Sequence, residues 1–123
     1  MGLLPEIDIE FLDEKGFTYH LDQYPGGMYL TIKEFDFPEN YSPRKASLLI
    51  NVITGYPGSA LDMFWTTPDV KLLNGSMPTA SSHKETHNGQ IWQRWSRHTA
   101  WRLGIDNIQT FITSIKKELA KGI

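Results

Sequence analysis

Cysteine is absent from the 123-residue sequence. Disulfide bonds, thiolate metal sites and a thioester formed on this chain are therefore excluded. The sequence also has no run of eighteen apolar residues, and it does not begin with a basic segment followed by an apolar one. We therefore predict neither a membrane span nor a signal peptide, and we expect a cytoplasmic protein with no membrane partner.

A strongly basic character is missing as well, since the formal net charge is −2. Residues 1–69 hold four basic and eleven acidic side chains, whereas residues 70–105 hold five basic side chains and one acidic one. A local positive region on an acidic body attracts a specific anionic group better than it binds a bulk polyanion. We therefore expect no nucleic-acid partner. Phosphate-loop and dinucleotide motifs are absent too, so no cofactor is expected.

The segment from Ile91 to Arg102 has the most unusual composition in the chain. It contains three of the four tryptophans and three of the four arginines. Guanidinium groups present planar pairs of donors to carboxylates or phosphates, and indole rings offer large rigid contact surfaces. A boundary strand with buried tryptophans, whose arginines extend to solvent, would account for the same composition. We interpret the segment as a functional site.

Hydrophobic periodicity predicts an α+β fold in a single domain, residues 1–123. A short N-terminal helix is expected between Pro5 and Gly16, although the alternation within it also fits a strand. A C-terminal helix is predicted to begin with a capping box of Asp106 and Gln109 and to pack on a sheet. The segment before it, residues 69–90, is polar and is expected to form a long functional loop.

Strands are expected between the two helices as a four-stranded antiparallel meander. Their expected ranges are 17–21, 28–37, 46–54 and 61–66. The second strand should contain a bulge or bend, because its apolar alternation shifts between Ile32 and Phe35. The third is almost continuously apolar, as is typical of a central buried strand.

Four sequence features follow one another in a recognisable order. They are Gly55-Tyr56-Pro57, Phe64, the segment His87-Asn88-Gly89-Gln90-Ile91-Trp92, and Trp101. In this order they resemble the ubiquitin-conjugating-enzyme (UBC) family, in particular its divergent bacterial members. The resemblance implies the UBC fold, in which a crossover helix follows the meander. It also implies two partners, a ubiquitin-like protein and an adenylating activating enzyme.

The sequence departs from this family where the family's chemistry takes place. Trp92 occupies the position that resembles the catalytic cysteine, and the family's His-Pro-Asn signature is reduced to His87-Asn88. The fold is therefore expected without the family's thioester, which leaves two hypotheses within the family and one outside it.

In the first hypothesis the protein is a conjugating enzyme that carries the C-terminus of the ubiquitin-like protein as an ester on oxygen. Ser96 would be the nucleophile and His98 its base. Arg94 and Arg97 would stabilise the developing negative charge. The hypothesis depends on conformation, because Ser96 and His98 share a face only on a strand. A serine bonded to local backbone and a satisfied buried imidazole are the plain structural alternative.

The second hypothesis is a non-catalytic UBC variant that binds a ubiquitin-like protein or its activating enzyme. Arginines would contact an acidic surface or a C-terminal carboxylate, and exposed indoles would anchor the partner. The predicted partner-binding residues are Trp92, Trp95, Trp101, Arg102, His87 and Asn88.

The third hypothesis is a metal hydrolase of a different class. His83, His87 and His98 would hold zinc, with Glu85 as general base. The spacing differs from His-Glu-x-x-His, and the polar residues around it do not favour the helix that this motif requires. No metal is therefore assigned.

Overall fold

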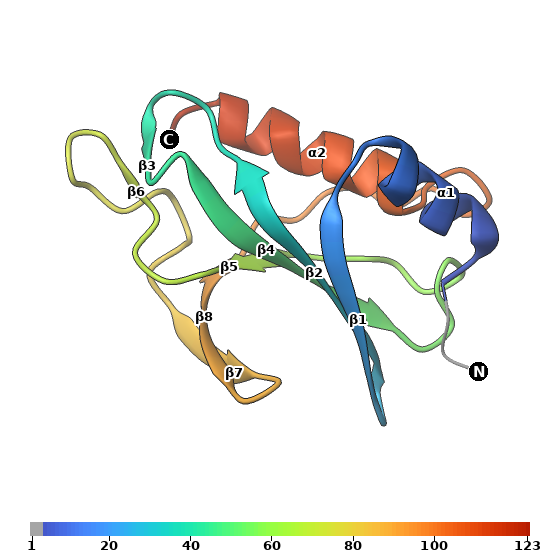
Figure 1. Cartoon of the computed structure of the whole chain (residues 1–123). Coiled ribbons are helices and arrows are strands. Elements are labelled where there is room, and N and C mark those ends of the chain that lie inside the picture. The colour runs from blue at the N-terminus through green and yellow to red at the C-terminus, as the bar shows by residue number, and fades with distance from the viewer. Residues whose placement is uncertain (1–3) are drawn as a thin grey trace.

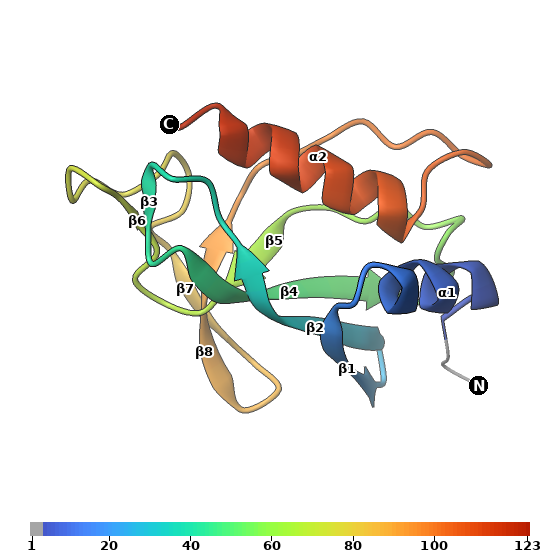
Figure 2. The same cartoon turned by 45° about the horizontal axis from the view of Figure 1, so that its top comes forward.

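The computed structural model describes residues 4–123 and consists of a curved sheet with two helices on one of its faces (Figures 1 and 2). The helices are α1 (Glu6–Glu14) and α2 (Ile108–Ala120), so both predicted helices are present. Within residues 4–123, no helix has the length and apolar character needed to cross a membrane.

In the described residues, 4–123, eight strands form one large sheet and one small one. They are β1 (Thr18–Tyr24), β2 (Gly27–Asp36), β3 (Tyr41–Ser42), β4 (Lys45–Ile53), β5 (Phe64–Thr66), β6 (Lys71–Leu72), β7 (Lys84–His87) and β8 (Gln90–Trp95). The large sheet has the order β1-β2-β4-β5-β8-β7, and β3 pairs with β6 in the small sheet. All pairings are antiparallel.

The predicted count of four strands is too small. The four expected strands correspond to β1, β2, β4 and β5, and the large sheet continues through the hairpin β7-β8. Asn88 and Gly89 join this hairpin with φ angles of 51° and 78°, as favoured in two-residue hairpin turns. The polar composition of residues 69–90 predicts a loop, and this prediction is wrong at β7, where the pair Asn88-Gly89 is a strong hairpin signal. The expected bend in β2 is present as a register shift between Ile32 and Phe35.

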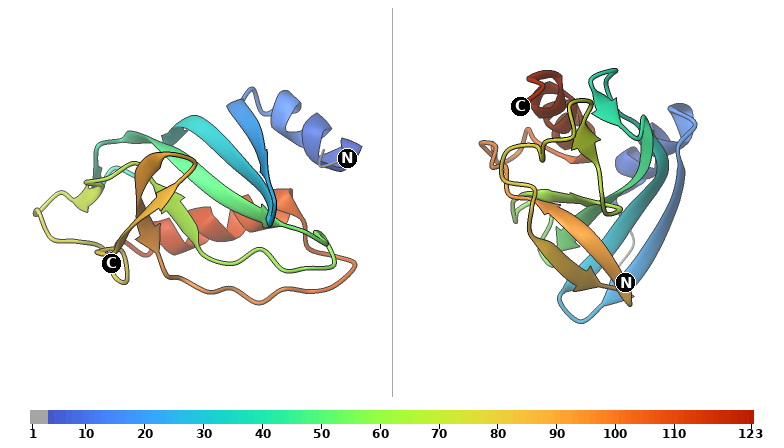
Figure 3. Two further views of the ribbon diagram at one scale, coloured as in Figure 1. Left: turned by 90° about the horizontal axis from the view of Figure 1, so that it is seen from below. Right: turned by 90° about the vertical axis from the view of Figure 1, so that its left-hand side faces the viewer.

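Because side chains alternate along each strand, one set faces the helices and the other set faces away from them. On β4, Leu48, Ile50 and Val52 join the main core, whereas Leu49 points to the opposite face. The predicted apolar stripe of α2 is buried against this core: Ile108, Phe111, Ile112, Ile115 and Leu119. The side of the sheet away from the helices, here called the open face, is seen in Figure 3.

The N-terminus of α2 begins one residue later than predicted. Asn107 is the N-cap, and its side chain accepts a hydrogen bond from the Thr110 amide. Thr110 Oγ1 in turn accepts from the Asn107 amide, which completes a capping box. Asp106 instead accepts hydrogen bonds from the Arg102 backbone and guanidinium.

Tyr56 connects both helices to the turn after β4. Its hydroxyl donates to Asp8 Oδ2 at 2.7 Å and accepts from the Ile108 amide at 2.7 Å. Burial raises the pKa of Asp8, and the hydrogen bonds from Tyr56 and Ile108 act against that rise. The turn therefore positions the start of α2 against α1.

Tyr56→Phe should lower the free energy of unfolding by about 1–3 kcal/mol, because a buried carboxyl and a helix amide each lose a partner. Tyr19→Phe is the matched control, since the Tyr19 hydroxyl contacts Asp13 at an exposed site. Chemical denaturation should show a change within about 0.5 kcal/mol for the control. Equal losses for the two variants would contradict the role given to Tyr56.

Candidate functional site

The open face carries an apolar cluster of its own. Leu49, Trp65 and Trp92 form this cluster, and Tyr29 packs against it. These side chains come from β4, β5, β8 and β2, where strand alternation turns each of them away from the helices. A set of polar side chains lies next to this apolar cluster on the open face.

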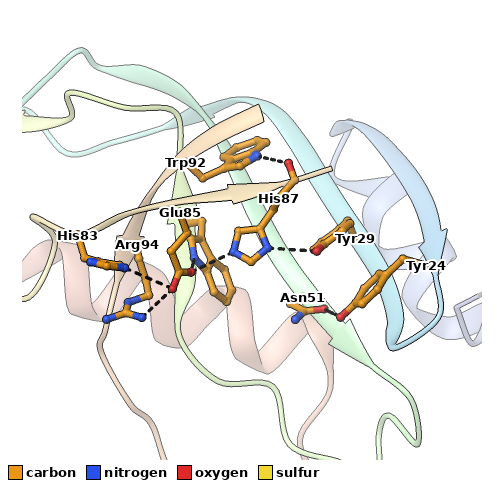
Figure 4. Close-up of polar contacts among 9 residues, drawn as sticks. Tyr24, Tyr29, Asn51, His83, Glu85, His87, Trp92 and Arg94 are labelled. Atoms are coloured by element: carbon orange, nitrogen blue, oxygen red, sulfur yellow. Dashed lines mark hydrogen bonds and ion pairs between the residues drawn. The ribbon is translucent and has the colours of Figure 1, made fainter. Parts of the chain in front are cut away.

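Glu85 is the centre of the polar set (Figure 4). Its Oε1 accepts a hydrogen bond from Trp65 Nε1 at 2.8 Å and lies 3.0 Å from His87 Nε2. Its Oε2 accepts from Arg94 Nη1 at 2.8 Å and lies 3.6 Å from His83 Nε2. One carboxylate thus connects β5, β7 and β8.

The Glu85 carboxylate is ionised in this environment. Burial alone would raise its pKa, but hydrogen bonds from His87, Trp65 and Arg94 and the charge of Arg94 lower the pKa to about 2. An ionised carboxylate can only accept, so the Nε2–H of His87 donates to Glu85. In a neutral imidazole the other nitrogen, Nδ1, is then an acceptor.

Tyr29 contacts that acceptor. Its hydroxyl lies 3.1 Å from His87 Nδ1 and, with the tautomer set by Glu85, donates its proton to that nitrogen. Tyr29, His87 and Glu85 therefore form a chain of hydroxyl, imidazole and carboxylate. Chains of this kind activate hydroxyl groups in other folds.

Contacts across the open face fix Tyr29 and the hairpin relative to each other. The Tyr24 ring stacks on Tyr29 with 4.5 Å between centroids, and the Tyr24 hydroxyl donates to Asn51 Oδ1 at 2.6 Å. At the hairpin turn, Asn88 Nδ2 donates to Asp22 Oδ2 on β1 at 3.2 Å. The curved sheet thus brings its last hairpin to its first two strands.

Comparison with known proteins identifies the family. A profile described as prokaryotic E2 family E matches residues 4–122. The chain belongs to this family. The resemblance to bacterial UBC-like proteins that lack the catalytic cysteine is thereby confirmed. No curated protein and no solved structure matches the chain.

In this E2 family member, Ser96 and His98 do not form the expected pair. Strand β8 ends at Trp95, so the two side chains do not share a strand face. Ser96 is half-buried, and its amide donates to the Ala80 carbonyl. His98 Nδ1 lies 2.8 Å from Asp62 Oδ1 at an exposed site. Within residues 4–123, no hydrogen bond joins Ser96 to His98.

The three arginines have separate surroundings. Arg97 is buried and donates to the backbone carbonyls of Thr79, Glu118 and Ile123, with its guanidinium 5.0 Å from the Trp95 ring. It therefore ties the end of α2 to the chain that follows β8. Arg94 belongs to the Glu85 cluster, and Arg102 pairs with Asp106.

Two of the predicted partner-binding tryptophans are core residues. Trp95 is fully buried and donates to Thr66 Oγ1, whereas Trp92 is 3% exposed and donates to the His87 carbonyl. Neither indole is available as an exposed anchor. The other predicted residues lie in two places, His87 and Asn88 at the hairpin turn, and Trp101 and Arg102 near the start of α2.

The histidines do not gather as a zinc site. His83 and His87 both contact Glu85, but His98 contacts Asp62 instead. In the described chain, 4–123, no three histidine, aspartate or glutamate side chains converge on a position suited to a metal.

Sequence reasoning missed Tyr29 and assigned Glu85 only to the metal hypothesis. The sequence could have placed Glu85 and His87 side by side, because residues two apart share a face of a strand. Tyr29 also alternates with Met28 and Leu30, which places it on the face away from the core. The contact between His87 and Tyr29 joins residues 58 positions apart and has no local signal.

Glu85 and the side chains that contact it, the Glu85 cluster, should make the free energy of unfolding depend on pH. The pKa of Glu85 in the folded protein, about 2, lies below the ordinary 4.5, so its ionised form stabilises the fold at higher pH. This contribution should be complete above about pH 5 and disappear as the pH falls toward 2. Glu85→Gln should cost about 2 kcal/mol at pH 7, measured by denaturant titration, and the difference from wild type should shrink at low pH.

Asp69→Asn is the control for that experiment, because Asp69 is exposed and lies 3.7 Å from Lys84. Exposed pairs contribute little, so this variant should follow the wild-type pH profile within about 0.5 kcal/mol. A constant difference between wild type and Glu85→Gln from pH 2 to pH 7 would argue against an ionised Glu85.

Proposed function

We propose that the protein takes part in a ubiquitin-like conjugation pathway, where it receives or positions a ubiquitin-like protein supplied by an adenylating activating enzyme. The observation that carries this proposal is the match to prokaryotic E2 family E across residues 4–122. The polar cluster on the open face supports it, because the cluster lies beside Trp92, the position that resembles the family's cysteine. Glu85 pairs with Trp92 across the hairpin.

The proposal does not depend on Ser96. A serine hydroxyl needs a hydrogen-bonded base to become a nucleophile, and His98 is engaged with Asp62. A non-catalytic binding role is the second candidate function. The buried indole of Trp92 favours it, since that position offers no reactive group.

A partner-binding surface is proposed near the start of α2. Ile7 and Ile105 are 62% and 60% exposed and line a hollow of about 180 Å³ together with Pro57. Arg102 lies close by in the sequence, paired with Asp106. Exposed apolar side chains beside a charged group are typical of protein-binding surfaces.

Ile105→Glu should weaken binding to the activating enzyme from the same organism at least tenfold, because a charge would be buried in an apolar contact. Calorimetric titration of the two purified proteins measures this. Leu73→Glu is the matched control, since Leu73 is 68% exposed and lies after β6, away from the hollow. Unchanged affinity for Ile105→Glu would place the docking surface elsewhere, and no binding by wild type would contradict the proposed function.

A further inference from the structure

Within residues 4–123, Tyr29 carries the one side-chain hydroxyl that contacts a histidine nitrogen. That histidine is held by Glu85, so nucleophile, base and orienting carboxylate are in order along one hydrogen-bonded chain. The other tyrosine at this site, Tyr24, directs its hydroxyl to an amide oxygen of Asn51, which is not a base. Figure 4 shows the two hydroxyls pointing to different partners.

We propose that the Tyr29 hydroxyl is an acyl acceptor, with His87 as its general base and Glu85 as the residue that positions His87. The acyl group is the activated C-terminus of a ubiquitin-like protein, so this inference rests on the proposed function. Tyr29 would carry a tyrosyl ester where the UBC family carries a thioester.

The first step forms this ester. Tyr29 Oη attacks the carbonyl carbon of a C-terminal acyl adenylate, or of a thioester on the activating enzyme, and its proton passes to His87 Nδ1. A carbon–oxygen bond to Tyr29 forms, and the bond from the carbonyl carbon to phosphate oxygen or sulfur breaks. AMP or the thiolate leaves. Glu85 stabilises the imidazolium that results.

The second step transfers the acyl group to a neutral amine. The nitrogen attacks the ester carbonyl, the carbon–oxygen bond to Tyr29 breaks, and His87 returns its proton to the departing phenolate. The proton lost by nitrogen goes to solvent. The phenol of tyrosine has an ordinary pKa of about 10, close to about 8.5 for a thiol. The phenolate of tyrosine is therefore a better leaving group than the alkoxide of an aliphatic alcohol, and a tyrosyl ester is correspondingly more reactive.

The surroundings of Tyr29 make a base necessary and hold one in place. Burial and the neighbouring Tyr24 raise the pKa of Tyr29, so the phenol stays protonated at neutral pH. Trp65 holds His87 and Glu85 in place, because its ring lies 5.0 Å from the His87 ring and its N–H donates to Glu85. Both ends of the imidazole are thus occupied by the partners that the reaction requires.

The test uses the full chain and a small activated ester, p-nitrophenyl acetate, which needs no protein partner. We expect p-nitrophenol release that depends on Tyr29, and an acetyl group on Tyr29 in peptide mass mapping whenever deacylation is slower than acylation. Tyr29→Phe keeps the ring and should abolish the Tyr29-dependent release. Tyr19→Phe is the matched control and should leave it within about twofold of wild type, because the Tyr19 hydroxyl contacts Asp13 at an exposed site and its ring packs against the main core, away from Tyr29.

Two further variants test the base and its orientation. His87→Ala should slow the reaction of Tyr29 by about 10²-fold or more, the usual contribution of a general base. In His87→Ala the remaining rate should rise with pH as the phenol ionises, whereas the wild-type rate should depend less on pH because His87 accepts the proton. Glu85→Gln should slow the reaction and alter this pH profile, while circular dichroism reports an unchanged fold.

Acetylation spread equally over the tyrosines, or a rate at Tyr29 that His87→Ala leaves unchanged, would overturn the inference. A second arm adds the activating enzyme, the ubiquitin-like protein and ATP from the same organism. A reductant-resistant, hydroxylamine-sensitive adduct should form on Tyr29 and be absent in Tyr29→Phe. Binding of the partners without that adduct would refute the inference and leave the proposed function standing. Absence of binding would refute the proposed function, and the small ester would still decide the reactivity of Tyr29.

Discussion

The ionised carboxylate of Glu85 holds the open face together, because donors from three strands meet at it. A partly buried negative charge is stable only where hydrogen bonds replace the water it has lost. Arg94 supplies the opposite charge and Trp65 a neutral donor from the centre of the sheet. The edge strand β7, which consists of polar residues, is thereby fixed beside the apolar cluster.

Local signals were enough to predict the elements that build the main core. The apolar positions of α2 recur at helical spacing, and β4 reads as a continuous buried strand. The hairpin was missed because β7 is polar on both faces: it pairs with β8 along one side, and its polar side chains replace the usual apolar pattern. Its strongest signal lay in the turn at Asn88-Gly89.

The candidate site could be predicted only in part, for a physical reason. The segment 91–102 was selected by its composition, but its indoles and arginines serve mostly to build the fold: Trp95 fills the core and Arg97 holds backbone carbonyls. Composition alone does not tell a buried guanidinium from an exposed one. The polar cluster depends instead on the curvature of the sheet, which brings Tyr29 and Asp22 to residues 58 and 66 positions later in the chain.

Trp92 explains why a reactive group on this fold would have to lie elsewhere on the same face. An indole at the position that resembles the family's cysteine fills the surface with apolar area and donates its one N–H to the His87 carbonyl. That same contact holds His87 where its ring reaches Tyr29. Tyr29 belongs to β2, which is paired on both sides, and a group on a paired strand is positioned more precisely than one in a loop such as Ser96. Trp92, at the position that resembles the cysteine of the UBC family, therefore also supports the imidazole beside the phenol.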